Sequence, residues 1–354
     1  MKVIFVASGN KTGGKVSAFV QSQYDSLVKE GLDMVLFPVQ GKGALNYLKA
    51  VFELRKTVKR EKPDIIHAHY STCGFVASLA CMGMRHRPKI VVSILGSFPT
   101  RSTKWRRVRW AIRHLWDGAL TKSERTRKQL GLDLPVIPNG VNLEVFHPMD
   151  YEEARRMVGF ERVRELESER VRERKYVIWC SHPSRPEKKW GVAVQAIKEL
   201  GSEGFRELES EGIRELGTIE LVAVYDKTPA EVALYMTAAD CLLLTSESEG
   251  SPNVIKEALA CNCPIVTTDV GDVNERLTGL EGCYVVKELG SERIRELENE
   301  GIRELESERV SELGKAIIKA LQFGKRTKGY ERILADGLEI SQVAQRIIEI
   351  YQHL

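Results

Sequence analysis

Short apolar runs alternate with helix-length amphipathic segments through both halves of this 354-residue chain. Most of the runs are continuously apolar, which is typical of parallel strands that helices cover on both faces. Because the alternation of strand and helix occurs twice, it predicts two doubly wound α/β domains. The expected strands are Lys2–Ala7, Asp33–Pro38, Ile65–Ala68, Lys89–Ile94, Gly118–Thr121, Val136–Ile137, Tyr176–Cys180, Ile219–Val224, Cys241–Thr245 and Pro264–Thr267.

The boundary between the two domains is expected near Pro148–Asp150, after the segment Ile137–Asn142. This places an N-terminal domain at residues 1–148 and a C-terminal domain at residues 149–336. Each is of ordinary size for a single domain.

Three segments of the C-terminal half break the strand–helix pattern: 161–174, 201–217 and 289–314. All are built from one octad, seen for example at Ser291–Glu298. Eight residues at 100° each leave about 80° of drift per repeat, so no lasting apolar stripe forms on a helix. We expect one repeated element inserted into surface connections, as short frayed helices or mobile loops without chemistry. A charged interaction arm is the alternative.

Composition excludes several classes of protein. The formal net charge of +4 is mild and does not indicate a nucleic-acid-binding protein. Seven scattered cysteines without a CxxC pair indicate reduced, mostly buried thiols in a cytosolic protein. We expect no signal peptide, because the apolar run Val3–Ala7 is too short, and no segment approaches the roughly 20 apolar residues that span a bilayer. We therefore expect a soluble protein or one that lies on a membrane surface.

The most informative segment for function runs from Glu249 to Glu257, directly after the apolar run Cys241–Thr245. Ser251 suits the N-cap of a helix and Pro252 suits its first position. The N–H groups of Asn253, Val254 and Ile255 would then point at a ligand in the turn, with the positive end of the helix dipole behind them.

This segment combines groups that suit two parts of one ligand. The carboxylates of Glu249 and Glu257 suit sugar hydroxyls, and the helix start suits phosphate. The pairing predicts a nucleotide sugar. The alternative is an ordinary βα unit in which Glu257 is a solvated helix residue.

The chain resembles the retaining glycosyltransferases of family 4, which have the GT-B fold. The run Tyr235–Cys261, continued by Pro264–Val273, resembles their C-terminal signature. Pro138–Asn142 with Phe146 resembles their interdomain segment, and Asp64–Tyr70 resembles their N-domain histidine motif. The closest group builds bacterial surface polysaccharides of the teichuronic-acid type.

This resemblance implies two Rossmann-like domains facing a central cleft and a final helix, 337–354, that crosses back to the first domain. It implies transfer of a sugar, with retained anomeric configuration, from a nucleotide-diphosphate sugar to a lipid-linked saccharide in surface polysaccharide synthesis. Two rivals stay open: a non-catalytic carbohydrate-binding or scaffold protein, and a P-loop nucleotide-binding protein. Donor base, sugar and acceptor are not identified by the sequence.

The basic loop Ser184–Lys189 resembles the clamp that holds the donor diphosphate in this family. Arg185 can bind phosphate bidentately, and Lys188 or Lys189 supplies a point charge. Ser181 and His182 replace the usual Gly-Arg start of the loop. Because cations already face the leaving phosphates, the resemblance implies a metal-independent reaction without a cofactor.

Further roles follow from the same resemblance. Glu257 would bind the ribose hydroxyls, Glu249 the transferred sugar, and His69 the donor sugar near the reacting carbon. His67, on the same strand face, is expected to be structural. The expected catalytic residues are His69, Arg185, Lys188 and Glu249. The expected donor-binding residues are Gly13, Gly14, Arg185, Lys188, Lys189, Glu249, Gly250, Ser251, Pro252, Asn253, Val254 and Glu257.

The loop Gly9–Lys15 offers two interpretations. Its spacing is close to a Walker A motif, but Val16 stands where Ser or Thr would bind Mg²⁺. In the glycosyltransferase interpretation, Gly13 and Gly14 begin the first helix close to the donor diphosphate. We prefer the second interpretation.

The segment Thr103–Trp116 combines an apolar stripe with five basic residues between Lys104 and Arg113, and Trp110 stands among them. A basic amphipathic helix with tryptophan suits an anionic membrane surface. The alternative is a solvated face over a core stripe, with Trp105 in the core. We therefore expect a cytoplasmic protein with a peripheral site at the inner face of the plasma membrane.

Overall fold

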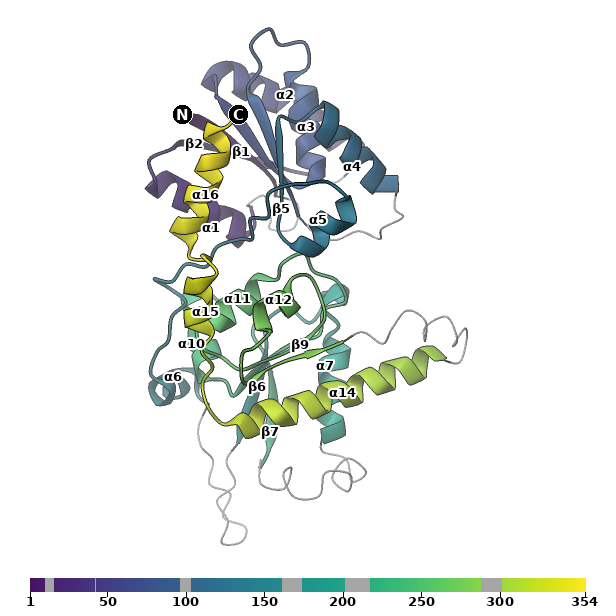
Figure 1. Cartoon of the computed structure of the whole chain (residues 1–354), viewed down its shortest axis with the longest axis vertical. Coiled ribbons are helices and arrows are strands. Elements are labelled where there is room, and N and C mark those ends of the chain that lie inside the picture. Colours follow the sequence, from purple (N-terminus) through teal and green to yellow (C-terminus); the bar gives the residue numbers. More distant parts are fainter. Residues whose placement is uncertain (10–15, 42, 96–102, 161–173, 201–216, 288–300) are drawn as a thin grey trace. The chain divides into compact units, whose positions relative to one another are not determined.

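The computed structural model describes residues 1–9, 16–41, 43–95, 103–160, 174–200, 217–287 and 301–354. The chain forms two compact units (Figure 1). Unit 1 contains Met1–Asn142 and Gly337–Leu354, and unit 2 contains Leu143–Asp336. The end of the predicted N-terminal domain, at residue 148, therefore lies in unit 2.

Unit 1 is built on a parallel five-stranded sheet in the order β2-β1-β3-β4-β5. Its strands are β1 (Lys2–Ser8), β2 (Asp33–Val39), β3 (Ile65–His69), β4 (Lys89–Ile94) and β5 (Gly118–Thr121). Its helices are α1 (Ala18–Lys29), α2 (Ala44–Glu61), α3 (Ser71–Cys81), α4 (Thr103–His114), α5 (Glu124–Leu130) and α16 (Ile340–Gln352).

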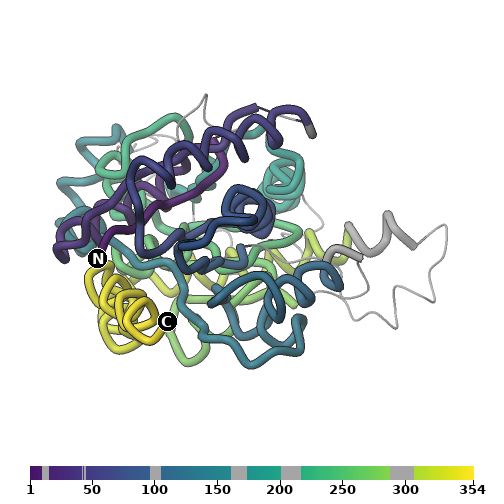
Figure 2. The backbone as a smooth tube through the Cα atoms, turned by 90° about the horizontal axis from the view of Figure 1, so that it is seen from above, coloured from purple at the N-terminus to yellow at the C-terminus, as the bar shows by residue number. Residues whose placement is uncertain are grey.

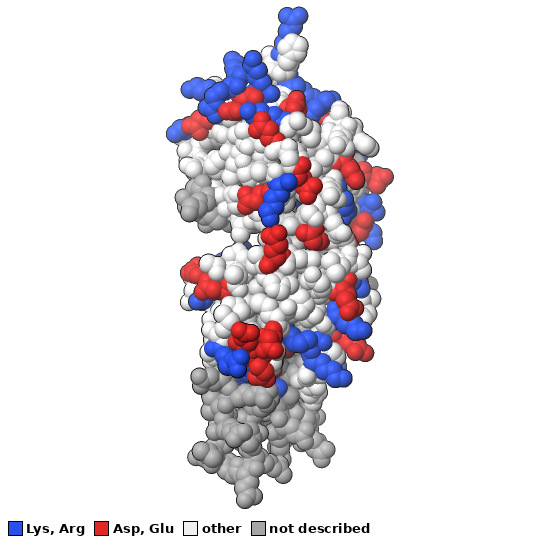
Figure 3. All heavy atoms as spheres, turned by 90° about the vertical axis from the view of Figure 1, so that its left-hand side faces the viewer, with Lys and Arg blue, Asp and Glu red and all other residues white. Residues whose placement is uncertain are grey.

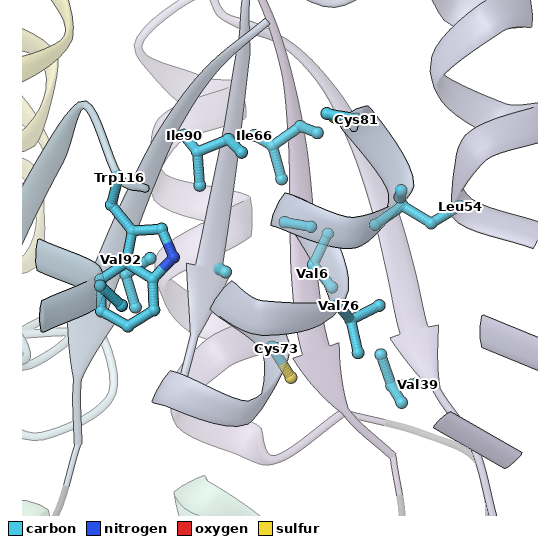
Figure 4. Close-up of a cluster of buried hydrophobic side chains, with 14 of the residues drawn as sticks. Val6, Val39, Leu54, Ile66, Cys73, Val76, Cys81, Ile90, Val92 and Trp116 are labelled. Carbon is cyan, nitrogen blue, oxygen red and sulfur yellow. The ribbon is translucent and has the colours of Figure 1, made fainter. Parts of the chain in front are cut away.

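The continuous apolar character of β1 reflects burial on both faces of the sheet. Ile4 and Val6 belong to one core cluster, which α2, α3 and α4 complete. Figure 4 shows Val6 of this cluster with Leu54 of α2 and Val76 of α3. Val3 and Phe5 belong to a second cluster on the other face, which includes side chains from α1 and α16. Alternate residues of the strand thus enter different cores, as expected for a doubly wound sheet.

The last helix, α16, is part of unit 1 although the chain first passes through unit 2. An isolated parallel bridge joins Val141 to Glu339. The Glu339 carboxylate caps α16 by accepting from the N–H groups of Ser341 and Gln342. The two chain termini consequently lie near each other (Figures 1 and 2).

Unit 2 contains a second parallel five-stranded sheet, in the order β10-β9-β8-β6-β7. Its strands are β6 (Lys175–Trp179), β7 (Ile219–Ala223), β8 (Cys241–Leu244), β9 (Ile265–Thr268) and β10 (Cys283–Val286). Its helices are η1 (a 3₁₀ turn, Pro186–Lys188), α6 (Tyr151–Val158), α7 (Trp190–Leu200), α10 (Pro229–Ala238), α11 (Asn253–Ala260), α12 (Val273–Leu277), α14 (Gly301–Phe323) and α15 (Gly329–Ala335).

Two strand predictions need correction. Val136–Ile137 is not a strand, because only Val136 forms an isolated bridge, to Thr121. The edge strand β10 was not predicted, and all four of its residues are partly exposed.

The expectation of frayed helices or loops for the third octad segment was wrong for residues 301–314. They form the first part of α14, a continuous helix of 23 residues. Val310 and Leu313 are buried, and they share a core cluster with residues of β6, β8 and α7. The segments 161–173, 201–216 and 288–300 lie outside the described residues.

The distribution of surface charge and the state of the cysteines agree with the expectations from composition. Acidic and basic side chains are interspersed on the face shown in Figure 3, with Lys and Arg gathered at its upper end. All seven cysteines are free, and five of them are buried. No helix in the described part of the chain combines the length and apolar character needed to cross a bilayer.

Candidate active site

The candidate site lies at the carboxyl edge of the unit 2 sheet, where the connections that follow β6, β8 and β9 meet. Thr245, the first residue after β8, joins two of these connections. Its Oγ1 lies 2.9 Å from the carbonyl oxygen of Lys188 and accepts a hydrogen bond from Trp179 Nε1 at 3.0 Å. The N–H of Glu247 donates to the carbonyl of Glu187 at 3.2 Å. The basic loop is therefore fixed against the loop that precedes α11.

Lys188 forms an ion pair with Glu249. The two side chains are largely buried, with 13% and 19% of their surfaces exposed. Sequence analysis could not decide between Lys188 and Lys189, and the structure places Lys188 against Glu249. Lys189 Nζ instead lies 3.5 Å from Glu247 Oε2, and its backbone has a positive φ of 56°.

Arg185 is on the same loop, one residue before the 3₁₀ turn η1. Its Nη2 lies 2.9 Å from the Glu187 carboxylate, and 46% of its side chain is exposed. The guanidinium is thus held by a neighbour on its own loop and remains open to solvent on its other side. Its Nε and Nη2 both donate to Glu187 Oε1, and the guanidinium can exchange this carboxylate for a phosphate, which it can bind bidentately.

The start of α11 differs from the prediction. Pro252 is the N-cap residue, and the helix begins at Asn253, so the prediction that Ser251 is the N-cap was wrong. Ser251 Oγ instead donates to Asp272 Oδ2 at 2.8 Å. The N-cap residue Pro252 makes no side-chain cap bond, and the start of a helix favours an anionic ligand through its N–H groups and dipole.

The backbone of this loop is packed against the connection that follows β9. Gly271 has a φ of +59°, and a Cβ at this position would lie 2.7 Å from the carbonyl oxygen of Gly250. Only glycine allows this approach. Gly271 and Asp272 are therefore site residues that the sequence analysis did not assign, although both lie within the motif Pro264–Val273.

Glu257 lies one turn into α11 and is partly buried. Burial raises its pKa to about 7, and the charge of Lys256 only partly opposes this shift. The negative charge of Glu257 contributes to a raised pKa of Cys180, so the carboxylate lies near the end of β6. Among the described residues, only burial and the charge of Lys256 act on the pKa of Glu257, and no hydrogen bond contributes to the shift.

Two buried hydroxyl groups at the same edge also lack partners within the described residues. They are Ser181 Oγ, after β6, and Ser246 Oγ, after β8. Buried polar groups are usually hydrogen-bonded, and exceptions often mark ligand sites. In the sequence, Ser181 stands out only as a departure from the family pattern, and Ser246 lies within the signature Tyr235–Cys261 without an assigned role.

In unit 1, His69 ends β3 and is fully buried. Neither ring nitrogen has a hydrogen-bond partner in the described structure. Burial, together with the charges of His67 and Lys122, holds the pKa of His69 well below its usual value, so the ring is neutral. Lys122, buried directly after β5, was not identified from the sequence.

His67 has the environment of a structural residue, in agreement with the prediction. Its ring stacks on that of His69 with centroids 4.7 Å apart. Its two nitrogens make buried hydrogen bonds to Tyr351 Oη and Ser93 Oγ, at 2.5 and 2.7 Å. The tie to Tyr351 joins β3 to α16 and orients the histidine pair.

Not all predicted site residues can be placed. Gly13 and Gly14 lie outside the described residues, as does most of the glycine-rich loop. Across the part of the chain that is described, no group of three His, Cys, Asp or Glu side chains could hold a metal ion.

Comparison with known proteins gives a match for each half of the chain. Residues 10–145 match the domain described as Glycosyltransferase Family 4, and residues 174–298 match Glycosyl transferases group 1. A stretch of 44 residues is 50% identical to TuaC of Bacillus subtilis (strain 168), a provisionally named teichuronic acid biosynthesis glycosyltransferase. That stretch covers 12% of this chain and 11% of TuaC.

Solved structures resemble the whole chain. A glycosyltransferase from Rickettsia africae ESF-5 has a TM-score of 0.65 at 15% identity, over 99% of this chain and 98% of the other. Alr3699/HepE of Anabaena, in complex with UDP, has a TM-score of 0.64 at 15% identity over 100% of both chains. At such low identity the likeness establishes the fold alone.

The fold and the two domain matches define the class. Two parallel-sheet Rossmann-like units with these neighbours constitute the GT-B fold. The chain belongs to the family 4, or group 1, glycosyltransferases. The family match includes the glycine-rich loop at residues 10–15, which supports the glycosyltransferase interpretation of that loop over a P-loop.

Proposed function

We propose that the protein transfers a sugar from a nucleotide-diphosphate sugar to a saccharide acceptor, with retained anomeric configuration. The observation that carries this proposal is the ion pair of Lys188 with Glu249, beside the uncapped start of α11. One edge of a parallel sheet thus offers cations, the start of a helix and carboxylates together. Alr3699/HepE, with a similar fold, has been solved with UDP and with UDP-glucose, which supports a nucleotide-sugar donor.

The proposed roles follow from the charges. Arg185 and Lys188, with the first N–H groups of α11, bind the diphosphate and stabilise the negative charge that develops as it leaves. Glu257 accepts hydrogen bonds from the ribose and Glu249 from the transferred sugar. His69, neutral and unpartnered, hydrogen-bonds the donor sugar.

Lys188 must change partners, or share them, when the donor binds. In the free protein its charge is neutralised by Glu249. A diphosphate would attract Lys188 and free one or both Glu249 oxygens for a sugar hydroxyl. The ion pair would then hold both groups in place until the ligand replaces it.

We further propose that fixed cations serve instead of a metal ion and that no cofactor takes part.

The acceptor is proposed to be a lipid-linked saccharide of surface polysaccharide synthesis, at the cytoplasmic face of the membrane. The short match to TuaC supports the pathway.

On α4, Trp105 is buried, in agreement with the alternative that places it in the core, whereas Trp110 is 54% exposed beside exposed Arg106 and Arg107. In a sedimentation assay with anionic vesicles, Trp110→Ala should reduce binding; equal binding to neutral vesicles would contradict the membrane site.

The donor proposal is tested by a panel of nucleotide sugars in a thermal-shift assay, followed by donor turnover with the best ligand. A ligand that binds the folded state raises the melting temperature. Arg185→Ala should then remove about 2–4 kcal/mol of transition-state stabilisation, the size of a lost oxyanion donor. Turnover should be unchanged by EDTA, and NMR of the product should show the anomeric configuration of the donor.

A matched control is Lys198→Met, because Lys198 is an exposed cation on α7 away from the loop. It should leave turnover unchanged. If Arg185→Ala changed turnover less than tenfold, the role of Arg185 would be refuted. If no nucleotide sugar were bound or turned over, the proposal as a whole would fail and a carbohydrate-binding role would be favoured.

A further inference from the structure

Lys256 is a buried cation with no assigned role. It lies in the first turn of α11, and only 1% of its surface is exposed. Its location is electrostatically unfavourable on two counts: burial penalises the ammonium group, and the start of a helix already carries partial positive charge. Burial lowers its pKa to about 8, although the charge of Asp272 opposes the shift. A cation kept at this position needs a physical reason.

The ammonium group is the first member of a hydrogen-bonded series. Lys256 Nζ donates to Ser251 Oγ at 3.0 Å, and Ser251 Oγ donates to Asp272 Oδ2 at 2.8 Å. Arg276 Nε donates to the same Asp272 oxygen at 3.1 Å. The Asp272 side chain is 2% exposed, so the series is shielded from water.

This series determines the state of Ser251. Its hydroxyl group donates a hydrogen bond to Asp272 and accepts one from Lys256, so the side chain is held from both sides. Ser251 stands between Gly250 and Pro252 in the loop that carries Glu249. The loop is therefore tied down at its centre by Lys256 and at Gly250 by the packing of Gly271.

We propose that Lys256 is a positioning residue: through Ser251 and Asp272 it holds the loop 249–252 ready for the donor, and its charge adds to the positive potential at the start of α11. It does not touch the donor. This inference rests on the proposed function. Binding geometry that exists before the ligand arrives improves affinity and rate, because the ligand does not have to order the loop.

A role in stability alone predicts different behaviour. Within the described part of the chain, Lys256 has no direct carboxylate partner, and Asp272 keeps its ion pair with Arg276 when Lys256 is replaced, so the change to methionine removes the desolvation penalty of the ammonium group and leaves no buried carboxylate unpaired. Lys256→Met should therefore keep or raise the melting temperature under either interpretation. Only a positioning role predicts that donor use becomes worse in a protein that is equally stable.

Lys256→Met is the main variant, and Ser251→Ala removes the same hydrogen bond from its other end. In each we expect the donor KM to rise on the order of 10–100-fold, as for a misplaced binding group, with a smaller fall in kcat. The double variant should be little worse than either single one, because both act through one contact. Lys198→Met is the control and should match the wild type.

The pH profile separates the charge of Lys256 from its shape. The charged groups that act on Lys256 are Asp272, Arg276 and Glu257. In the wild type, donor kcat/KM should fall as pH rises through about 8, where Lys256 loses its proton. This alkaline limb should be absent in Lys256→Met.

Hydrogen exchange tests the inference without a donor. Amides of the loop 249–253 should exchange faster in Lys256→Met than in the wild type, while those of β8 and β9 should not change. If loop exchange stayed the same, or if an active wild type and Lys256→Met had equal KM and pH profile, the inference would be overturned and the proposed function would stand. Failure of the wild type to bind any nucleotide sugar would instead count against the proposed function.

Discussion

At the scale of single residues, the protonation of Glu257 has a measurable consequence. Burial raises its pKa to about 7, above that of an exposed glutamate. The folded state thus holds this proton over a range of pH where the unfolded chain has released it. Between about pH 4.5 and 7, the free energy of unfolding therefore falls as pH rises, because Glu257 ionises less readily in the folded state than in the unfolded chain.

We predict that Glu257→Gln removes this part of the pH dependence. The free energy of unfolding of the wild type should fall, relative to the variant, by roughly 1–3 kcal/mol between pH 5 and pH 8. Urea denaturation of both proteins at the two pH values measures the difference. Parallel stability curves for the two proteins would show that the pKa of Glu257 is not raised.

The site was predicted from the sequence only in part. The motifs predict which kinds of side chain form the site. They also predict that these side chains lie at one edge of the sheet, since the carboxyl ends of parallel strands meet there. Which lysine meets Glu249 depends on how two loops far apart in the sequence pack against each other, which local sequence does not specify. Ser251 was mistaken for the N-cap because its hydroxyl instead donates to Asp272, 21 residues away, and accepts from Lys256 in the first turn of α11.

At the scale of helices and strands, burial decides what is predictable. The buried strands are visible as apolar runs because both faces are covered. The edge strand β10 was missed although its four residues are apolar, and exposure alone is not the reason, because β2 and β7 are also partly exposed and were predicted. The helix α14 was missed because an octad does not keep one face, whereas the segment after Glu308 does bury side chains.

We predict that Leu313→Ala lowers the free energy of unfolding by about 2–5 kcal/mol, because Leu313 is fully buried and its loss leaves a cavity. Glu312→Ala, one residue earlier and half-exposed, should change it by less than about 0.5 kcal/mol. Chemical denaturation distinguishes the two. Similar small effects would mean that α14 does not pack as described.

At the scale of the whole molecule, unit 1 depends on both ends of the chain. Val343, Ala344, Ile347 and Tyr351 of α16 are buried in the same cluster as Phe5 of β1. This dependence cannot be read from local sequence, because it joins residues more than 300 positions apart. It followed here only as an expectation from the family resemblance.

We predict that Ile347→Ala destabilises unit 1 by about 2–5 kcal/mol. Hydrogen exchange should accelerate in β1 and β3, while β8 and β9 of unit 2 should be unaffected. Glu349→Ala, an exposed neighbour on the same helix, is the control and should resemble the wild type. Equal acceleration in both sheets would contradict the division into units.

The return of α16 to unit 1 also constrains how the polypeptide matures on the ribosome. The strands of unit 1 emerge first, but their second core face is complete only after Tyr351 has left the exit tunnel. At synthesis rates of roughly 5–20 residues per second, the nascent sheet waits on the order of tens of seconds with apolar surface exposed. During translation, this half of the protein should therefore be a preferred client of chaperones.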